Sequence, residues 1–207
     1  MQTGTSFIDV NAPVGEEQLR AIRRLDNNAL IIRLHFTINH LSRWLSPIHD
    51  RNRLERARFR GEPTAKEIVL GMREEEQRLY PKMYAIANQN NPDLDKLPPY
   101  HPSFTRQQSD EEHSTIVLMA SFRRLRQSTC SLLRSLPDDA WRRKGISRLE
   151  HNVTLRELAE ELVAHDYRFL RALDQTLDAA GAREGLAAIQ KTPLDELLTL
   201  VPDRLTV

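Results

Sequence analysis

The sequence is poor in cysteine, glycine and aromatic residues, and neither charge sign dominates it. Its one cysteine, Cys130, cannot form an internal disulfide, so the cysteine content gives no sign of an oxidising compartment. Only 7 glycines and 6% aromatic residues argue against an all-β sandwich, which needs many turns. With 30 basic and 29 acidic residues, the formal net charge of +1 creates no global field to attract nucleic acid or an anionic membrane.

Long apolar runs are missing as well. No stretch approaches the ~18 uninterrupted apolar residues of a membrane-spanning helix, and residues 1–15 lack the basic start and apolar run of a signal peptide. We therefore expect a cytoplasmic protein with no membrane partner. The arginines within residues 51–60 are diluted by Glu55 and accompanied by only one aromatic residue, Phe59, so we expect a solvated loop there and no binding of nucleic acid.

Helical periodicity is what the sequence does show. Four segments, at about residues 29–45, 64–88, 109–136 and 154–180, repeat apolar residues at steps of three and four, which places those residues on one face of a helix. Three of the segments begin with capping-box spacing, in which a hydroxyl and a carboxylate three residues later satisfy free backbone N–H groups. The pairs are Thr64 with Glu67, Ser109 with Glu112, and Thr154 with Glu157.

Four amphipathic helices bury their apolar faces most simply against one another, so the predicted fold is an all-α four-helix bundle. Shorter helices are expected near both termini, at about residues 16–24 and after a cap at Thr192. We expect a single domain over residues 1–207. Its bundle core spans residues 28–180, and residues 181–207 form a C-terminal extension.

Two long connections, residues 46–63 and 89–108, join the predicted bundle helices. Together they are rich in Pro, Asn and Arg. Loops of this length in a compact domain tend to be functional or mobile.

The apolar stripe of the last predicted helix contains a histidine. A buried imidazole needs partners for both ring nitrogens, so His165 is either a core histidine bonded to a neighbouring helix, or a metal ligand or general base. Glu75 holds a comparable place on the second helix, where it either meets His165 or lies at the stripe's edge and faces water with Glu74 and Glu76. Glu161, one turn before His165, is a competing partner. The stripe consists of Leu155, Leu158, Leu162, His165, Phe169, Ala172 and Thr176.

Two segments of the sequence point to a known family. The run 154–158 (TLREL) followed by 164–170 (AHDYRFL) resembles the last bundle helix of the DinB-like superfamily, which includes the YfiT-type proteins, and residues 64–76 resemble its second helix. The resemblance covers about residues 28–180. It implies a four-helix bundle, often a homodimer, with a divalent metal held by three histidines in a pocket at one end. It also implies, for some members, transfer or isomerisation of substrates with low-molecular-weight thiols.

The implied ligand set is incomplete in this chain. His165 matches the first histidine of the last helix, Phe169 matches the second, and Gly71 matches the histidine of the second helix. A catalytic zinc site usually needs three protein ligands, so we expect a degenerate site and no cofactor. Zn, Ni or Fe would bind only if Glu75, Glu161 or a first-helix histidine (His35 or His40) rebuilt the site.

The prediction for function follows from that loss. We expect a small-ligand-binding or interaction module of the DinB-like superfamily, in which His165, Glu75, Glu161, Gly71 and Phe169 line the former pocket. The alternative is a metal-dependent enzyme of the thiol transferase or isomerase kind, acting on a small molecule. Cys130 is expected to fill space in the core and not to act as a nucleophile.

Overall fold

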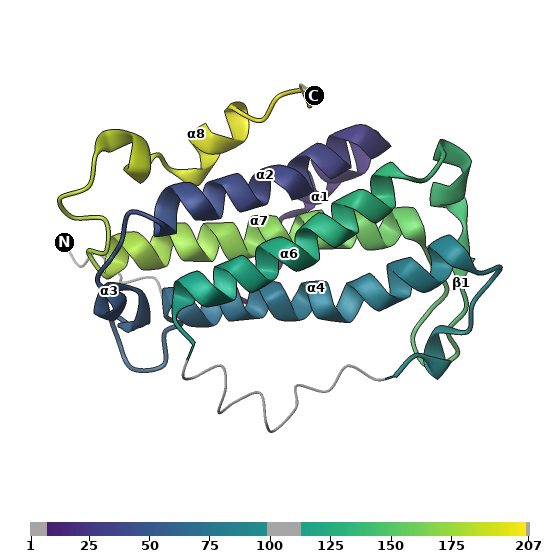
Figure 1. Ribbon diagram of the computed structural model, residues 1–207, viewed down its shortest axis with the longest axis horizontal. Helices are drawn as coiled ribbons and strands as arrows, with labels where there is room; N and C mark the ends of the chain where they lie inside the picture. Colours follow the sequence, from purple (N-terminus) through teal and green to yellow (C-terminus); the bar gives the residue numbers. More distant parts are fainter. Residues whose placement is uncertain (1–7, 99–112, 206–207) are drawn as a thin grey trace.

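Four long helices form the body of the computed structural model, which describes residues 8–98 and 113–205. They are α2 (Asn27–Leu45), α4 (Ala65–Asn88), α6 (Thr115–Arg134) and α7 (Leu155–Ala179), and they run side by side along the long axis of the molecule (Figure 1). Helices α2 and α4 each pack against both α6 and α7. The arrangement is a four-helix bundle, as the sequence predicts.

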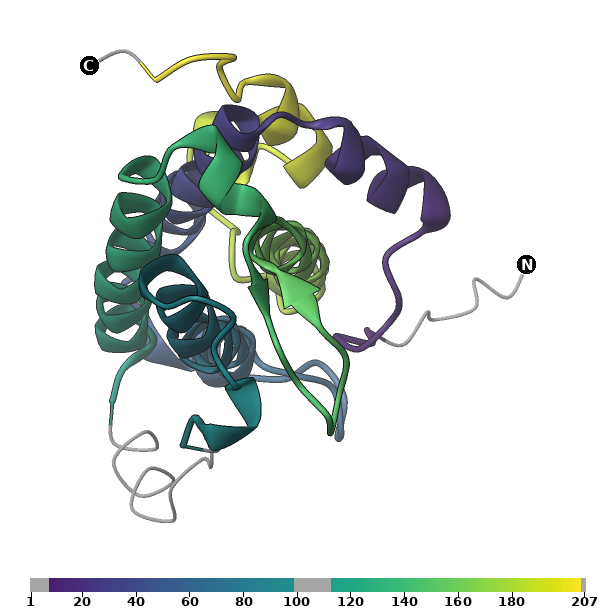
Figure 2. The same cartoon turned by 90° about the vertical axis from the view of Figure 1, so that its right-hand side faces the viewer.

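Short elements surround the bundle. Figure 2, which looks nearly along the bundle axis, shows α1 on the outer side of α7, away from α6. Helix α8 contacts α7, and the 3₁₀ turn η3 contacts α2, so the segment after α7 folds back over the same side. The short elements are α1 (Glu16–Arg24), α3 (Arg51–Glu55), α8 (Leu194–Thr199), the 3₁₀ turns η1 (Leu94–Lys96), η2 (Asp138–Arg142) and η3 (Ala188–Lys191), and an antiparallel ladder of β1 (Lys144–Gly145) with β2 (Val153–Thr154).

The helix ends follow the predicted capping signals. The capping boxes at Thr64 and Thr154 are both present. After α7, Gly181 takes a φ of +62°, which lets its N–H reach the Asp178 carbonyl at 3.0 Å while the Ala182 N–H reaches the Leu177 carbonyl at 2.9 Å. This pair of bonds is a Schellman motif, for which glycine is the favoured residue.

Two predicted helix starts turned out differently. The Ser109–Glu112 box lies outside the described residues, and the described helix α6 starts at Thr115, capped by Ser114. The predicted cap at Thr192 is wrong by one residue, because Pro193 is the N-cap of α8. Between the bundle helices, the first long connection holds α3 and the second holds η1, with residues 99–108 outside the described part.

The core is divided into two apolar clusters along the bundle axis. The predicted stripe of the first bundle helix is buried throughout, with Leu34, Leu41 and Leu45 wholly inaccessible. One cluster, near α3, gathers around Trp44, Phe122 and Phe169, and includes the α8 residues Leu194 and Leu197. The other gathers around Leu79, Trp141 and Leu155. Charged groups occupy the level between them.

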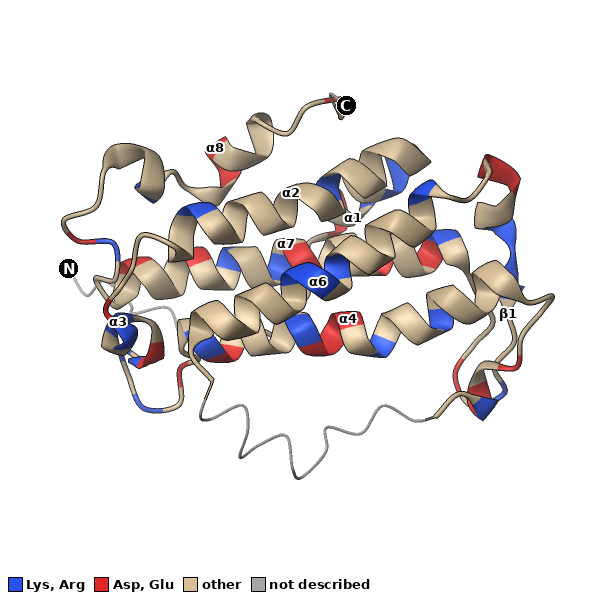
Figure 3. Cartoon of the chain, viewed as in Figure 1, with Lys and Arg blue, Asp and Glu red and all other residues tan. Residues whose placement is uncertain are grey.

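The distribution of surface charge agrees with the balanced composition, and the helices agree with the lack of long apolar runs in the sequence. On the face seen in Figure 3, acidic and basic residues are interspersed along the bundle helices, and neither sign gathers into a large patch. None of the helices described between residues 8 and 205, outside the 99–112 gap, is long and apolar enough to cross a membrane.

Candidate functional site

Three of the predicted site residues meet where α4 packs against α7. The His165 Nε2 atom lies 3.5 Å from Glu161 Oε1 and 3.9 Å from Glu75 Oε2. The His165 side chain keeps 17% of its surface exposed, so it stands at the boundary of the bundle. Its predicted place within the buried stripe of α7 is therefore wrong, and both proposed carboxylate partners lie beside it.

Two arginines complete this group, which we call the His165 cluster: Glu75, Arg78, Glu161, His165 and Arg168. Arg78 donates from Nε to Glu75 Oε2 at 2.8 Å and from Nη2 to Glu161 Oε1 at 2.6 Å. Arg168 Nη2 lies 2.6 Å from His165 Nδ1. Because a guanidinium only donates, Nδ1 must accept, and the ring proton sits on Nε2, facing the two carboxylates.

The sequence interpretation missed both arginines of the His165 cluster, although their spacing could have revealed them. Arg78 follows Glu75 by three residues and Arg168 follows His165 by three, the separation at which side chains on one helix meet.

The His165 cluster also lowers the pKa of one of its two carboxylates, Glu161. This pKa falls to about 2, because the hydrogen bonds from His165 and Arg78 outweigh the effect of burial, which alone would raise it.

Gly71 and Phe169, the other two predicted site residues, also come together here. A Cβ atom at Gly71 would lie 2.9 Å from Phe169 Cε1, so the phenyl ring covers the bare backbone of α4. The same ring stacks on the His165 imidazole with centroids 6.3 Å apart. Positions 71, 165 and 169, which the family resemblance pairs with metal ligands, thus converge in space. A cavity of about 260 Å³ beside them is lined in part by Gly71, Glu75 and Phe169.

The residues of the His165 cluster do not fit a metal ion as they stand. A metal ligand must be deprotonated and free to donate a lone pair. The Nε2 atom that faces the carboxylates carries the ring proton, and Arg78 holds both carboxylates through hydrogen bonds. Across the described residues, no group of three His, Cys, Asp or Glu side chains is arranged to hold a metal ion.

A second set of charged residues lies in the centre of the bundle, and we call it the Arg126 network: Thr37, Glu76, Arg126, Thr129 and Asp166. The three charged members come from α4, α6 and α7 and are 1%, 0% and 5% exposed, in that order. Arg126 donates from Nε to Glu76 at 2.9 Å and from Nη2 to Asp166 Oδ1 at 2.8 Å, and its Nη1 bonds Asp166 Oδ2. Thr37 donates to Asp166 at 2.6 Å, and Thr129 donates to Glu76.

The ionic contacts keep Arg126 charged although no water reaches it. Burial by itself lowers the pKa of Arg126, but the neighbouring charges of Asp166 and Glu76 raise it above its ordinary value. A fourth hydrogen bond of Arg126, from Nη1 to the Leu34 carbonyl at 3.1 Å, ties the group to α2. The network therefore joins all four bundle helices through one guanidinium.

Sequence reasoning missed this network. It grouped Glu76 with residues facing water, which is wrong, and it did not single out Arg126, which is buried on α6. A signal was present, since Met72, Glu76, Leu79 and Met83 follow the four-three-four spacing of a buried helix face.

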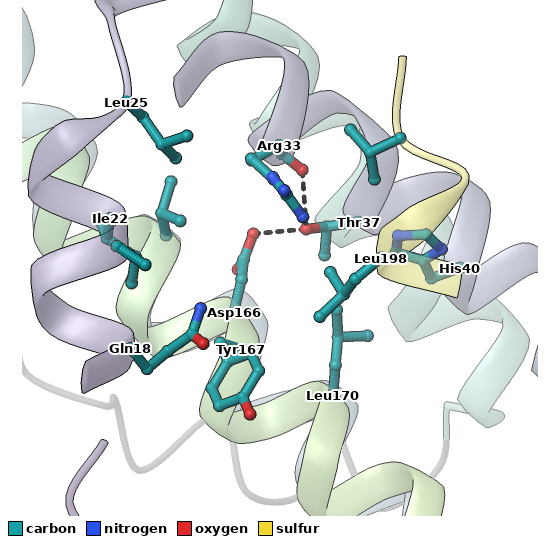
Figure 4. A pocket seen from close by; sticks show the side chains of 13 residues that line it. Gln18, Ile22, Leu25, Arg33, Thr37, His40, Asp166, Tyr167, Leu170 and Leu198 are labelled. Atoms are coloured by element: carbon teal, nitrogen blue, oxygen red, sulfur yellow. Dashed lines mark hydrogen bonds between the residues drawn. The ribbon is translucent and has the colours of Figure 1, made fainter. Parts of the chain in front are cut away.

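One wall of the Arg126 network borders a cavity between α1, α2, α7 and α8, which we call the α1–α7 cavity. Its volume is about 70 Å³. Figure 4 shows Arg33, Thr37 and Asp166 gathered on one side, with Ile22 and Leu25 of α1 opposite. The other lining residues are Gln18, Ala21, His40, Val163, Tyr167, Leu170, Leu198 and Val201.

The titratable groups around this cavity respond to burial. The pKa of His40 falls to about 4, chiefly through burial and then the positive charge of Arg43, while Asp166 opposes the shift. Burial also lowers the pKa of Arg33.

Cys130 lies outside this cavity. Its thiol is buried, and burial raises its pKa to about 11, so it stays protonated and inert at neutral pH.

Comparison with known proteins supports the fold. No protein-family model matches the sequence, and no curated protein matches it. Among solved structures that do match is YfiT from Bacillus subtilis, described as a probable metal-dependent hydrolase with an unusual four-helix bundle topology. It superimposes with a TM-score of 0.62 over 86% of this chain and 95% of its own, at 14% sequence identity. The chain therefore has the DinB-like four-helix-bundle fold that the resemblance implied.

Proposed function

We propose that this chain is a small-ligand-binding or interaction module, in which ion pairs and apolar packing have replaced the metal centre that the fold resemblance implies. The Arg78 guanidinium carries the proposal, because it donates to both carboxylates that could have joined His165 around an ion. A divalent cation would have to displace this positive charge before it could reach either carboxylate.

The packing of Phe169 on Gly71 supports the same proposal. Histidines at these positions would supply two imidazoles, whereas the phenyl ring offers no lone pair and fills the space over the glycine. One imidazole remains at the three matched positions. A single neutral ligand holds a divalent ion far more weakly than the three protein ligands of a catalytic zinc site.

The second candidate function is a metal-dependent enzyme, either of the thiol transferase or isomerase kind or a hydrolase, as YfiT is described. The geometry of the His165 cluster favours it in one respect. His165 Nε2 lies within 4.0 Å of two carboxylate oxygens, so removal of Arg78 and of the ring proton would leave one nitrogen close to two oxygens.

Elemental analysis separates the two candidates. Protein purified without a chelating tag is incubated with Zn²⁺, Ni²⁺ or Fe²⁺, desalted and analysed, and we expect far less than one equivalent of each metal. A variant carrying Gly71→His and Phe169→His serves as the positive comparison, and we expect it to retain about one equivalent of Zn²⁺.

The matched controls concern single histidines. His165→Ala removes the remaining imidazole, and His49→Ala removes a histidine at an exposed loop position. If the native protein retains one equivalent of metal, and only His165→Ala abolishes that binding, the metal-dependent enzyme replaces the metal-free module as the supported function. Should the double variant bind no metal either, the kinship inferred for positions 71, 165 and 169 would be wrong.

The proposal treats residues 1–207 as one domain that acts in the cytoplasm, with the bundle core at 28–180 and the extension at 181–207. Burial of Leu194 and Leu197 in the same apolar cluster as bundle residues supports the assignment of the extension to that domain. The homodimer that the resemblance implies stays a prediction, and light scattering coupled to gel filtration measures it.

A further inference from the structure

We infer that the α1–α7 cavity is the ligand site and that it takes a short-chain organic monocarboxylate, with the carboxylate bound by Arg33. This inference rests on the proposed function and names its site and ligand class. The cavity lies on the α1 side of α7, whereas the His165 cluster lies where α7 packs on α4, so the two regions are chemically separate.

Arg33 is the group that calls for an anion. Its guanidinium lines the cavity and is partly withdrawn from water, yet within residues 8–98 and 113–205 it forms no ion pair or side-chain hydrogen bond. Burial lowers its pKa with no carboxylate opposing the change. Other half-buried arginines of the bundle, such as Arg78, have carboxylate partners. A ligand carboxylate would supply the missing acceptor for a bidentate contact.

The one carboxylate in the cavity wall is already engaged. Both oxygens of Asp166 accept bonds from Arg126, and Oδ2 also accepts from Thr37. Beyond it, His40 is buried and has no hydrogen-bond partner among the described residues for either ring nitrogen. A neutral imidazole carries one N–H and one acceptor nitrogen, so His40 can add a donor beside Arg33 for a ligand carboxylate.

The size and the walls of the cavity define the rest of the ligand. One water molecule needs about 10–15 Å³ of cavity volume. A cavity of about 70 Å³ therefore holds roughly five waters or a molecule of a few heavy atoms. Apart from the polar wall, Gln18 and Tyr167, the lining is aliphatic, with Ile22 and Leu25 from α1 and Leu170 from α7. Leu198 and Val201 cover it from the C-terminal segment. An unbranched chain of about four carbons matches this space.

The charges near the cavity also give a reason to consider the opposite kind of ligand, a cation. The Arg126 network contains two carboxylates and one guanidinium, so it carries one surplus negative charge, and an amine would approach Asp166. The second carboxylate, Glu76, does not line the cavity. We therefore assign the ligand to Arg33, and an amine serves as the competing probe.

Calorimetric titration with matched probes tests the assignment. We expect butanoate to bind with a Kd in the millimolar range, butanamide to bind at least about tenfold more weakly, and butan-1-amine not to bind. From acetate to propanoate to butanoate, each added CH₂ should tighten binding by about threefold to fourfold. Tighter binding of butan-1-amine than of butanoate would overturn the inference.

Variants locate the site. Arg33→Met should weaken butanoate binding at least about tenfold, and Arg33→Lys, which keeps the charge, should retain part of it. Arg24→Met removes a cation from an exposed position outside the cavity and should leave binding unchanged. Circular dichroism on each variant confirms folding. Equal binding by the native protein and both Arg33 variants would overturn the site.

Metal analysis on the same preparation keeps the two proposals apart. If the protein contains no metal and does not bind butanoate at about 20 mM, this inference is overturned, while the proposed loss of the metal centre is still supported. Protein that binds both butanoate and one equivalent of Zn²⁺ would overturn the proposed loss of the metal centre and support the cavity.

Discussion

The His165 cluster and the Arg126 network use neighbouring residues on the same two helices, yet they occupy different environments. Glu75 and Glu76 are adjacent on α4, and His165 and Asp166 are adjacent on α7. One residue along a helix rotates the side chain by about 100°. That rotation carries the second member of each pair into the dry centre, where Glu76 is 1% exposed, and leaves the first at the boundary, where Glu75 is 23% exposed.

The difference teaches what each set of charges can do. Water screens the His165 cluster, so its ion pairs contribute little to stability, and its residues can change without unfolding the bundle. The charged members of the Arg126 network are almost wholly buried, so they depend on one another for partners.

The largest expected effect comes from removal of the central guanidinium. Arg126→Met leaves Glu76 and Asp166 buried without a counter-charge, and we expect the free energy of unfolding to fall by about 3–5 kcal/mol. Urea denaturation followed by circular dichroism measures the loss. A decrease below about 1 kcal/mol would show that the centre is hydrated or that the carboxylates are protonated.

The next effect is a pH dependence centred on His40. Its pKa is about 4 in the folded protein against 6.5 for the unperturbed side chain, so between these values the unfolded chain binds a proton that the folded protein does not. Stability should therefore fall as pH decreases from about 6.5 to about 4, by up to about 3 kcal/mol. Thermal unfolding across this range checks the sign.

The control for this pH dependence is His40→Gln, which has no titrating ring and should show a flatter profile between pH 6.5 and 4. Glu161 acts lower on the scale, because its pKa is about 2 in the folded protein. Its contribution is present above pH 4.5 and is lost as the pH falls toward 2. A variant profile as steep as the native one would place His40 in contact with water.

A smaller effect tests the packing of Phe169 on Gly71. Gly71→Ala should improve helix propensity by about 1 kcal/mol, yet the new methyl meets the phenyl ring at 2.9 Å, and overpacking costs about 1–3 kcal/mol. We expect a net loss of about 1 kcal/mol in the native background and a gain of similar size in a Phe169→Ala background. Equal effects in both backgrounds would contradict the contact.

The smallest effect is expected at the boundary cluster. Arg78→Met, the matched partner of Arg126→Met, should cost less than about 1 kcal/mol, and the cost should shrink further as salt is added. Urea denaturation at low and high ionic strength measures both. A loss as large as that of Arg126→Met would remove the distinction between the two sets of charges.

Much of the fold could be predicted, because its determinants are local. The stripe of α2 and the capping boxes at Thr64 and Thr154 depend on residues within a few positions of one another. The site was predicted less completely. Periodicity predicted that His165 lies in the core. Steps of three and four select a single line of residues, whereas a buried helix face spans about 100°. Periodicity alone therefore does not tell the middle of the buried face from its edge.

The sequence by itself determined that this chain forms amphipathic helices, where most of them begin and end, and that Phe169 and Gly71 stand where the family resemblance expects histidines. Only the tertiary structure decided which of two adjacent charged residues is buried, because that depends on how each helix is rotated toward its neighbours. It also brought Arg78 between Glu75 and Glu161, and left Arg33 beside a cavity without an acceptor, because these arrangements join residues from helices that are distant in sequence.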